Sequence, residues 1–263
     1  MPFALMSAMR RRSAKKLAGL AMETSSFVAL SKQAAIQHHR LTSLANNIAN
    51  ASTPGYRKNG MNFATFLSRQ TTTSPIIYTV EHPAFVNLVA GTITQTANPL
   101  DLAISDNDRA FFVVLPQAEG RPMLTRAGTF HLDGTGRVVT PNGDPLLGVN
   151  DQPIIMPGID PKISVSSSGE VLEGDQVVGQ IKILELSPGA AVNHRGRGLY
   201  ESPATRPAAG FVVHQGALEG SNVEVVSEMT ELIQLTRNYE MLQQLLSTEH
   251  TRLTDLIDKM PMV

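Results

Sequence analysis

Two long stretches without proline or glycine lie at opposite ends of the sequence, at residues 22–53 and 221–260. Proline removes a backbone donor and glycine loosens the chain, so each of these stretches is predicted to form one continuous helix. Of the 16 prolines, 13 fall between Pro75 and Pro207, where glycine is also frequent. The middle of the chain is therefore predicted to consist of short strands and turns.

Both predicted helices carry a narrow apolar stripe. The N-terminal stripe contains Phe27, Leu30, Ala34, Leu41, Leu44 and Ile48, with Gln37 as its one polar member. The C-terminal stripe repeats every seven residues through Val225, Leu232, Tyr239, Leu246, Leu253 and Met260. Its companion column, Met229, Thr236, Gln243, His250 and Ile257, is polar in its middle, while Leu235, Leu242 and Leu256 widen the stripe from the other side.

The apolar stripes bear on whether each helix can be stable without a partner. Burial of one stripe is comparable in free energy to the conformational entropy lost when its helix is ordered, so the C-terminal helix requires a partner surface. We expect the two helices to pair in a coiled-coil-like layer or to pack against other subunits, with the stripes as the assembly interface. The alternative is that both helices cap the middle domain of a monomer.

The middle of the chain shows the patterns of β-structure. The segment 111–115 is a continuous apolar strand, and residues 100–104 and 180–186 alternate. Two hairpins are predicted, with turns at 133–136 and 166–169, because both turns contain glycine between strand-like residues. Short strands at this spacing indicate a small sandwich or an open barrel.

The predicted fold is therefore α+β, in five parts. Residues 57–98 are expected to be an extended linker, residues 99–215 the central all-β domain, and residues 22–56 and 216–263 the two helices of a terminal-helix domain. Residues 1–21 carry five basic residues and no acid, which leaves 17 basic against 23 acidic residues in the rest of the chain. This segment is either a basic tail or a misassigned start, and we favour Met22 as the first residue.

Several functional classes find no support in the sequence. The excess of acidic residues after residue 21 disfavours nucleic acid and anionic membranes as partners. No apolar run approaches the roughly 18–20 residues of a membrane span. The absence of cysteine excludes thiolate chemistry and disulfides. The neighbouring His38 and His39 point about 100° apart on a helix and cannot share a metal ion. Acid pairs such as Glu228 and Glu231 are interpreted as a solvated helix face. We expect no catalytic, cofactor or metal site.

The segment 44–57, LANNIANASTPGYR, can be interpreted from its chemistry alone. Asparagines suit a fraying helix end, and Thr53 is displaced from helical geometry by the following proline. Pro54 and Gly55 fit the centre of a type II turn. The segment also resembles the signature of flagellar rod and hook proteins. Collinear similarities at 99–114, 125–148 and 216–240 extend the resemblance over about residues 22–260. The signature positions are Asn46, Asn47, Asn50, Pro54, Gly55, Tyr56, Glu219, Ser221 and Asn222.

Within that family the chain is most similar to the proximal-rod type, since no long insert separates Arg57 from the β core. The distal-rod type is the alternative, followed by a monomeric binding module or an enzyme. The resemblance implies a structural subunit of the basal-body rod, a periplasmic drive shaft assembled from copies of itself and other rod proteins. It also implies export through the flagellar type III apparatus without a cleavable signal.

Overall fold

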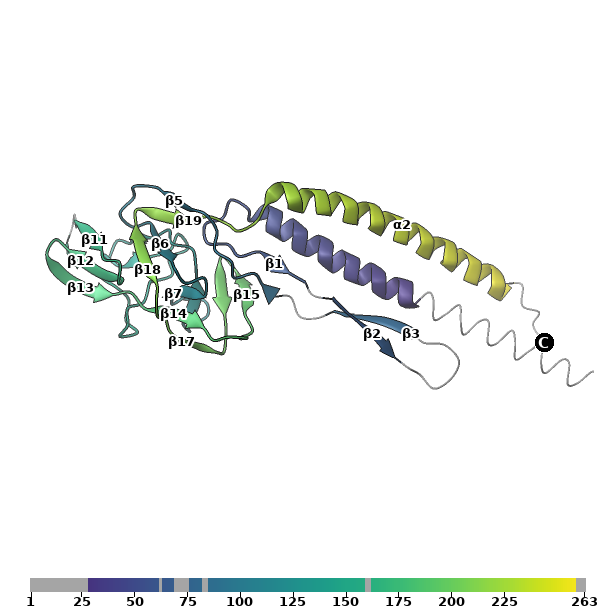
Figure 1. The fold of residues 1–263 in the computed structure, drawn as a ribbon, viewed down its shortest axis with the longest axis horizontal. Coiled ribbons are helices and arrows are strands. Elements are labelled where there is room, and N and C mark those ends of the chain that lie inside the picture. The colour runs from purple at the N-terminus through teal and green to yellow at the C-terminus, as the bar shows by residue number, and fades with distance from the viewer. Residues whose placement is uncertain (1–27, 62, 69–75, 82–84, 159–161, 259–263) are drawn as a thin grey trace, which may run out of the picture. The chain divides into compact units, whose positions relative to one another are not determined.

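The structure, a computed structural model, describes residues 28–61, 63–68, 76–81, 85–158 and 162–258 (Figure 1). The predicted basic tail, Met22, and two stripe residues, Phe27 and Met260, lie outside these ranges. The chain divides into two compact units. We call them the helical unit, formed by the segments up to Ala45, 61–82 and from Met229 onward, and the β unit, formed by Asn46–Gly60 and Pro83–Glu228.

The two predicted helices are present. Residues 28–49 are helical, and α2 runs from Val225 to Asp258. The first ends shortly before Pro54 and the second begins shortly after Gly220, as the distribution of these residues predicts. The α+β class is therefore confirmed, and no closed barrel forms among the described strands.

The strands are short and pair only in antiparallel fashion within the described ranges. Their bounds are as follows: β1 Asn59–Gly60, β2 Phe63–Ser68, β3 Ile76–Glu81, β4 Phe85–Val86, β5 Ile93–Gln95, β6 Leu102–Ser105, β7 Ala110–Val114, β8 Met123–Thr125, β9 His131–Leu132, β10 Val138–Val139, β11 Ile163–Val165, β12 Glu170–Glu173, β13 Gln176–Gln180, β14 Ile183–Leu186, β15 Asn193–Gly196, β16 Leu199–Glu201, β17 Thr205–Pro207, β18 Val212–Gln215 and β19 Ala217–Glu219.

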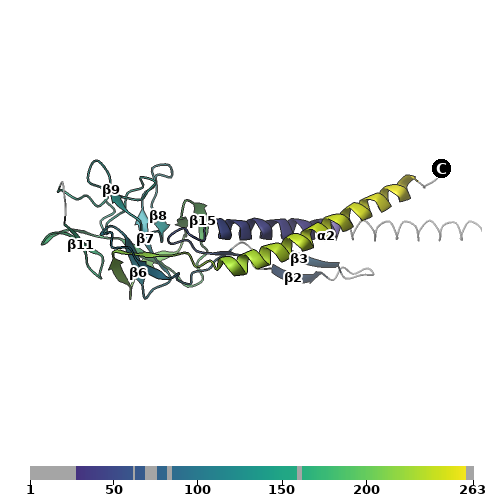
Figure 2. The ribbon, with the colours of Figure 1, turned by 90° about the horizontal axis from the view of Figure 1, so that it is seen from above.

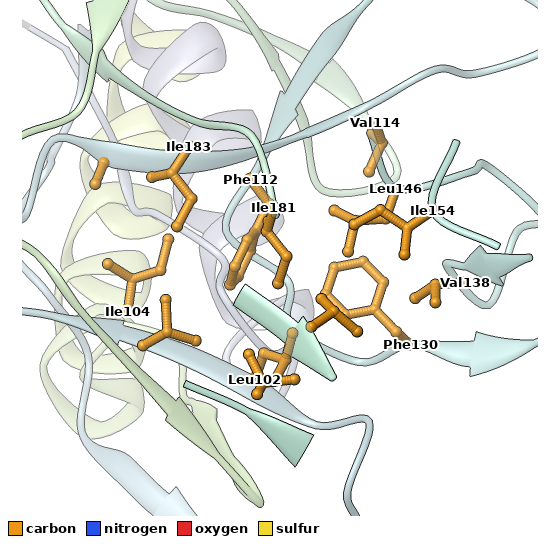
Figure 3. Packing of buried hydrophobic residues seen from close by; sticks show 14 of the residues in the cluster. Leu102, Ile104, Phe112, Val114, Phe130, Val138, Leu146, Ile154, Ile181 and Ile183 are labelled. Carbon is orange, nitrogen blue, oxygen red and sulfur yellow. The ribbon is translucent and has the colours of Figure 1, made fainter. Parts of the chain in front are cut away.

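The largest sheet has six strands in the order β15-β16-β8-β7-β14-β17. Every residue of β7 is buried, because successive side chains enter two different apolar clusters. Phe112 and Val114 join the larger cluster with Phe130, and Phe111 and Val113 join the smaller one. Figure 3 shows the larger cluster, in which the Phe112 and Phe130 rings meet edge to face at 5.6 Å. The continuous apolar run is thus a strand covered on both faces.

Both predicted hairpins are confirmed. β9 pairs with β10, and β11 pairs with β12. In the first turn, one carboxylate oxygen of Asp133 accepts hydrogen bonds from the backbone N–H groups of Thr135 at 2.8 Å and of Arg137 at 3.0 Å. The hydrogen bond from the side-chain hydroxyl of Thr135 lowers the pKa of Asp133, and the bonds from the Arg137 guanidinium and the two N–H groups add to this effect.

The expected extended linker at 57–98 differs from the structure, which places five strands there. β1 pairs with β4, β2 with β3, and β5 with β19. β1 and β4 have only two residues each, and β5 pairs with β19 from the other end of the β unit, so neither local alternation nor a neighbouring turn indicates these three strands. The β2–β3 hairpin belongs to the helical unit and the other strands to the β unit.

Candidate assembly interface and its buried polar cluster

The two sequence signatures, which lie far apart along the chain, meet within the β unit. The backbone N–H of Gly55 donates to the carbonyl of Glu219 at 2.8 Å, and the N–H of Lys58 donates to Oδ1 of Asn222 at 2.7 Å. The Asn222 amide donates in turn to the carbonyls of Asn87 at 3.0 Å and Val89 at 2.8 Å. The chain entering the β unit is thereby fastened to the chain leaving it.

The turn at Pro54 and Gly55 has the predicted form. The N–H of Tyr56 donates to the carbonyl of Thr53 at 3.2 Å, and Gly55 adopts a φ of +67°, as the third position of a type II turn requires. A Cβ at Gly55 would stand 2.3 Å from the backbone carbon of Arg126. Glycine is therefore needed both for its conformation and for the close approach of two backbones.

Glu219 lies between two arginines, Arg57 and Arg126, and all three side chains are almost fully buried. Its Oε1 is 2.8 Å from Nη2 of Arg57, and its Oε2 accepts from Nε of Arg126 at 2.5 Å. The N–H of Gly91 also donates to Oε1 at 3.0 Å. Burial lowers the pKa of Arg57, and the adjacent Glu219 carboxylate opposes that shift. Glu219 thus balances part of the charge of two cations removed from water.

The arginines extend this cluster into the β core. The Arg126 guanidinium donates to three backbone carbonyls, at 2.8 Å to that of Ile104, at 3.1 Å to that of Asn107, and also to that of Ala110. The N–H of Arg57 donates to the hydroxyl of Tyr200 at 2.9 Å. Burial raises the pKa of Tyr200 to about 12, so the hydroxyl is neutral at physiological pH. The four side chains that form this arginine cluster are Arg57, Arg126, Tyr200 and Glu219.

A second buried group surrounds Asn47. Its Oδ1 accepts from the Tyr56 hydroxyl at 3.1 Å and from the N–H of Asn59 at 2.9 Å, and its Nδ2 donates to Oε2 of Glu228 at 3.1 Å. Lys58 also pairs with Glu228, which is only 1% exposed. The interpretation of Glu228 as part of a solvated face is therefore wrong, because Asn47 and Lys58 compensate its burial.

Glu231, the other acid of that predicted pair, differs from Glu228. It is partly exposed and forms an ion pair with Arg40, which is also partly exposed. The expectation of a solvated position therefore fits Glu231 alone.

The remaining signature residues have local roles. The amide of Asn50 donates to the carbonyl of Asn46 at 2.9 Å, and the hydroxyl of Thr53 donates to Oδ1 of Asn50 at 3.2 Å, so these polar groups finish the helix. The hydroxyl of Ser221 accepts from the N–H of Val223 at 3.2 Å. Asn46 is exposed and belongs to neither buried group.

Five members of the buried groups are missing from the predicted sites, namely Arg57, Lys58, Arg126, Tyr200 and Glu228. No local pattern pairs Arg126 with a carboxylate 93 residues away. The signal that could have found Arg126 is the resemblance at 125–148, which contains it without indicating its partner.

His194 packs between the two buried tyrosines. Its ring centroid lies 5.7 Å from that of Tyr56 and 5.0 Å from that of Tyr200. Nδ1 accepts from the N–H of Gly196 at 3.1 Å, and the buried Nε2 has no hydrogen-bond partner among the described residues. Burial lowers the pKa of His194, so the neutral ring is the form that fits this site.

This burial predicts a pH dependence of stability. Because the pKa of His194 is lower in the folded than in the unfolded chain, the unfolded chain binds more protons as the pH falls through the ordinary histidine range. We expect the urea midpoint of the β unit to fall between pH 7.5 and 5.5, above the range where carboxylates titrate. His194→Phe should reduce this fall, whereas substitution of the exposed His131 by Gln should not. An equal fall in all three proteins would contradict the assignment.

Most residues of the apolar stripes lie in the helical unit. Leu44 and Leu235 are 5% and 4% exposed, and Ala34 is also buried. The half-buried members are Leu30, Leu41, Ile48, Leu232, Tyr239, Leu246 and Leu253. Arg40 pairs with Glu231, and the rings of His38 and Tyr239 lie 6.3 Å apart, so the two helices contact each other in antiparallel directions (Figures 1 and 2).

The buried face of α2 differs from the expected one at its first position. Val225, the first residue of the predicted column, is 39% exposed, as the helix begins only there. Leu235 and Leu242 accompany the stripe, and the exposed members of the companion column are Met229, Thr236, Gln243 and His250. A seven-residue repeat specifies one buried column of residues along a helix, but it does not specify which of the two neighbouring columns is also buried. The leucines complete the buried face because they remove more apolar surface from water.

Within the described ranges, no group of three or more histidine or acidic side chains could hold a metal ion. His38 and His39 are both exposed, and their rings meet edge to face. No helix among the described residues is both long and apolar enough to span a membrane.

Three family models match the chain. "Flagella basal body rod protein" matches residues 34–57, "Flagellar hook protein FlgE/F/G D1 domain" matches 107–173, and "Flagellar basal body rod FlgEFG protein C-terminal" matches 214–258. Arg57 and Asn47 fall in the first match, and Glu219 and Glu228 in the third. Arg126 falls in the second match, so the arginine cluster joins residues of all three matches, and the group around Asn47 joins residues of the first and the third.

Curated relatives cover most of the chain. It is 32% identical to the flagellar basal-body rod protein FlgF of Rhizobium meliloti over 90% of this chain and 98% of the relative. It is 33% identical to FlgF of Caulobacter vibrioides over 86% and 93%, respectively. It is also 31% identical to the flagellar basal-body rod protein FlgG of Bacillus subtilis, over 83% and 92%.

Proposed function

The chain belongs to the flagellar basal-body rod protein family, and from this premise we propose that it is a structural subunit of the proximal rod. The observation that carries this proposal is the union of the two signatures. They fasten the beginning and end of the β unit to each other, and each continues directly along the chain into one of the two helices. A subunit built in this way supplies two terminal helices from one braced β core.

We infer that the terminal helices pair as a coiled-coil-like layer and that neighbouring subunits cover the rest of their stripes. Support comes from the contact of Arg40 with Glu231 and from the burial of Leu235. Four residues of the α2 stripe are only half-buried in the single chain, namely Leu232, Tyr239, Leu246 and Leu253. Their remaining apolar surface favours further association, and a contact that does not close on itself generates a helical assembly.

Two observations favour the proximal position over the distal one: the chain segment between Arg57 and the β core is short, and the relatives include FlgF proteins. The FlgG relatives keep the distal rod as the alternative. The proposed location is the periplasmic part of the basal body, reached through the flagellar type III export apparatus. The proposed partners are further copies of the chain and other rod subunits, with no cofactor and no catalytic step.

Deletion and localisation test this function together. A strain that lacks the gene is expected to have no flagellar filaments and no swimming, because the rod is incomplete, and the unaltered gene should restore both. An epitope-tagged chain should co-purify with detergent-extracted basal bodies and be absent from those of a strain blocked in flagellar export. A swimming deletion strain, or a tagged chain that remains in the cytoplasm of swimming cells, would refute the proposal.

A further inference from the structure

A second apolar row runs along α2, away from its buried stripe. Met229, Ile233, Met241 and Leu245 are 50%, 55%, 62% and 49% exposed. They are spaced by four residues, with Arg237 completing the row. Ile233 lies two residues from Leu235 and Met241 two residues from Tyr239, so each points roughly 160° away from the stripe. We call this row the exposed ridge.

The spacing of the exposed ridge determines how another helix can pack on it. Scattered apolar residues are normal on a protein surface, but residues four apart form a continuous ridge. Ridges of this kind interdigitate at crossing angles of about −50°, whereas the seven-residue stripe favours about +20°. The two faces of α2 are therefore suited to two different neighbours, and the N-terminal helix of the same chain contacts the stripe.

Charge and side-chain size indicate the neighbour on the ridge. Helical residues 28–49 contain Lys32 and Arg40 and no acid, whereas α2 contains six acidic and two basic residues. Contact between two copies of α2 is disfavoured by like charge, and contact with an N-terminal helix is favoured. That helix also exposes small side chains, Ala35, Thr42 and Ala45, over which large apolar side chains can approach closely.

We propose that the exposed ridge of one copy packs on the N-terminal helix of a second copy of this chain, across the face of Ala35, Thr42 and Ala45. The proposal rests on the rod function and specifies which surfaces join its subunits. Every copy carries both surfaces, and they differ from each other, so the contact is heterologous and can be repeated from copy to copy. The buried stripe then holds a subunit together, and the ridge joins it to the next.

Cross-linking tests this contact, because the chain has no cysteine of its own. Two gene copies are co-expressed in a strain that lacks the gene. One carries Ile233→Cys, Met241→Cys or Leu245→Cys, and the other carries Ala35→Cys, Thr42→Cys or Ala45→Cys. We expect at least one pairing to give a disulfide-linked dimer in oxidised, isolated basal bodies. The matched control is Ser247→Cys, which is exposed on α2 about 160° from Leu245.

The outcomes separate this proposal from the function on which it rests. If the chain is present in basal bodies and no ridge pairing cross-links above the Ser247→Cys pairings, the ridge contact is refuted and the rod function stands. If the chain is absent from basal bodies, the function itself fails. As a second measurement, Leu245→Glu should weaken self-association of the full chain on the order of tenfold or more, and Ser247→Glu should not. Equal association of the two variants would also overturn the proposal.

Discussion

Leu232→Asp and Leu246→Asp, each introduced alone, are expected to leave cells without flagellar filaments. Both leucines lie on the α2 stripe and are half-buried in the single chain, so each has apolar surface left for a neighbouring subunit. Each substitution removes roughly 1.5–3 kcal/mol of apolar burial and places a charge where water is excluded. The loss recurs at every copy in the rod, and for that reason a modest local change should prevent assembly.

The measurement is the number of filaments per cell in electron micrographs, together with spreading in soft agar. Ser247→Asp is the matched control, since Ser247 is exposed and lies about 100° from Leu246 around the same helix. The urea midpoint of the β unit should be unchanged in all three variants, because the substituted residues belong to the helical unit. Normal filaments in both leucine variants would show that the stripe contributes nothing to assembly.

Glu219→Gln is expected to produce the largest loss of stability of any single substitution in the β unit. The substitution would keep the shape of the side chain but leave Arg57 and Arg126 as buried cations without a counter-charge. Removing one partner of a buried charge pair typically destabilises a protein by about 3–5 kcal/mol. That is a large part of the roughly 5–15 kcal/mol that stabilises an ordinary domain.

Urea unfolding at pH 7.5 measures this loss. The matched control is Glu201→Gln, which removes a partly exposed carboxylate that also pairs with two arginines, Arg121 and Arg195. Ion pairs at the surface contribute little because water solvates both charges, so the control should unfold near the wild-type midpoint. If both variants unfold at the same urea concentration, the arginine cluster does not brace the β unit.

Local chemistry is sufficient to predict much of this fold. The distribution of proline and glycine locates the helices and the β region, since these residues act on the backbone where they stand. Both hairpins follow from glycine-containing turns between strand-like residues. The turn at Pro54 and Gly55 is also predictable, because its hydrogen bond joins residues only three apart.

Long-range contacts cannot be predicted in the same way. The strand pair β5–β19 and the bond from Arg126 to Glu219 join residues far apart in sequence, and no periodicity records such pairs. A glutamate on a helix, such as Glu228, is ordinarily expected to face water. Its burial here is favourable only because Asn47 and Lys58 approach its carboxylate. The signature contains several members of these clusters but does not show that its two parts meet.

A side-chain-resolution density map of the isolated rod tests the subunit architecture most directly. The N-terminal helix and α2 of each copy should be paired antiparallel, with Leu232 and Leu246 buried further by helices of adjacent subunits than they are in the single chain. The β unit should remain braced by Glu219 between its two arginines. A map in which these leucines face water, or in which the β units alone join the subunits, would contradict assembly through the terminal helices.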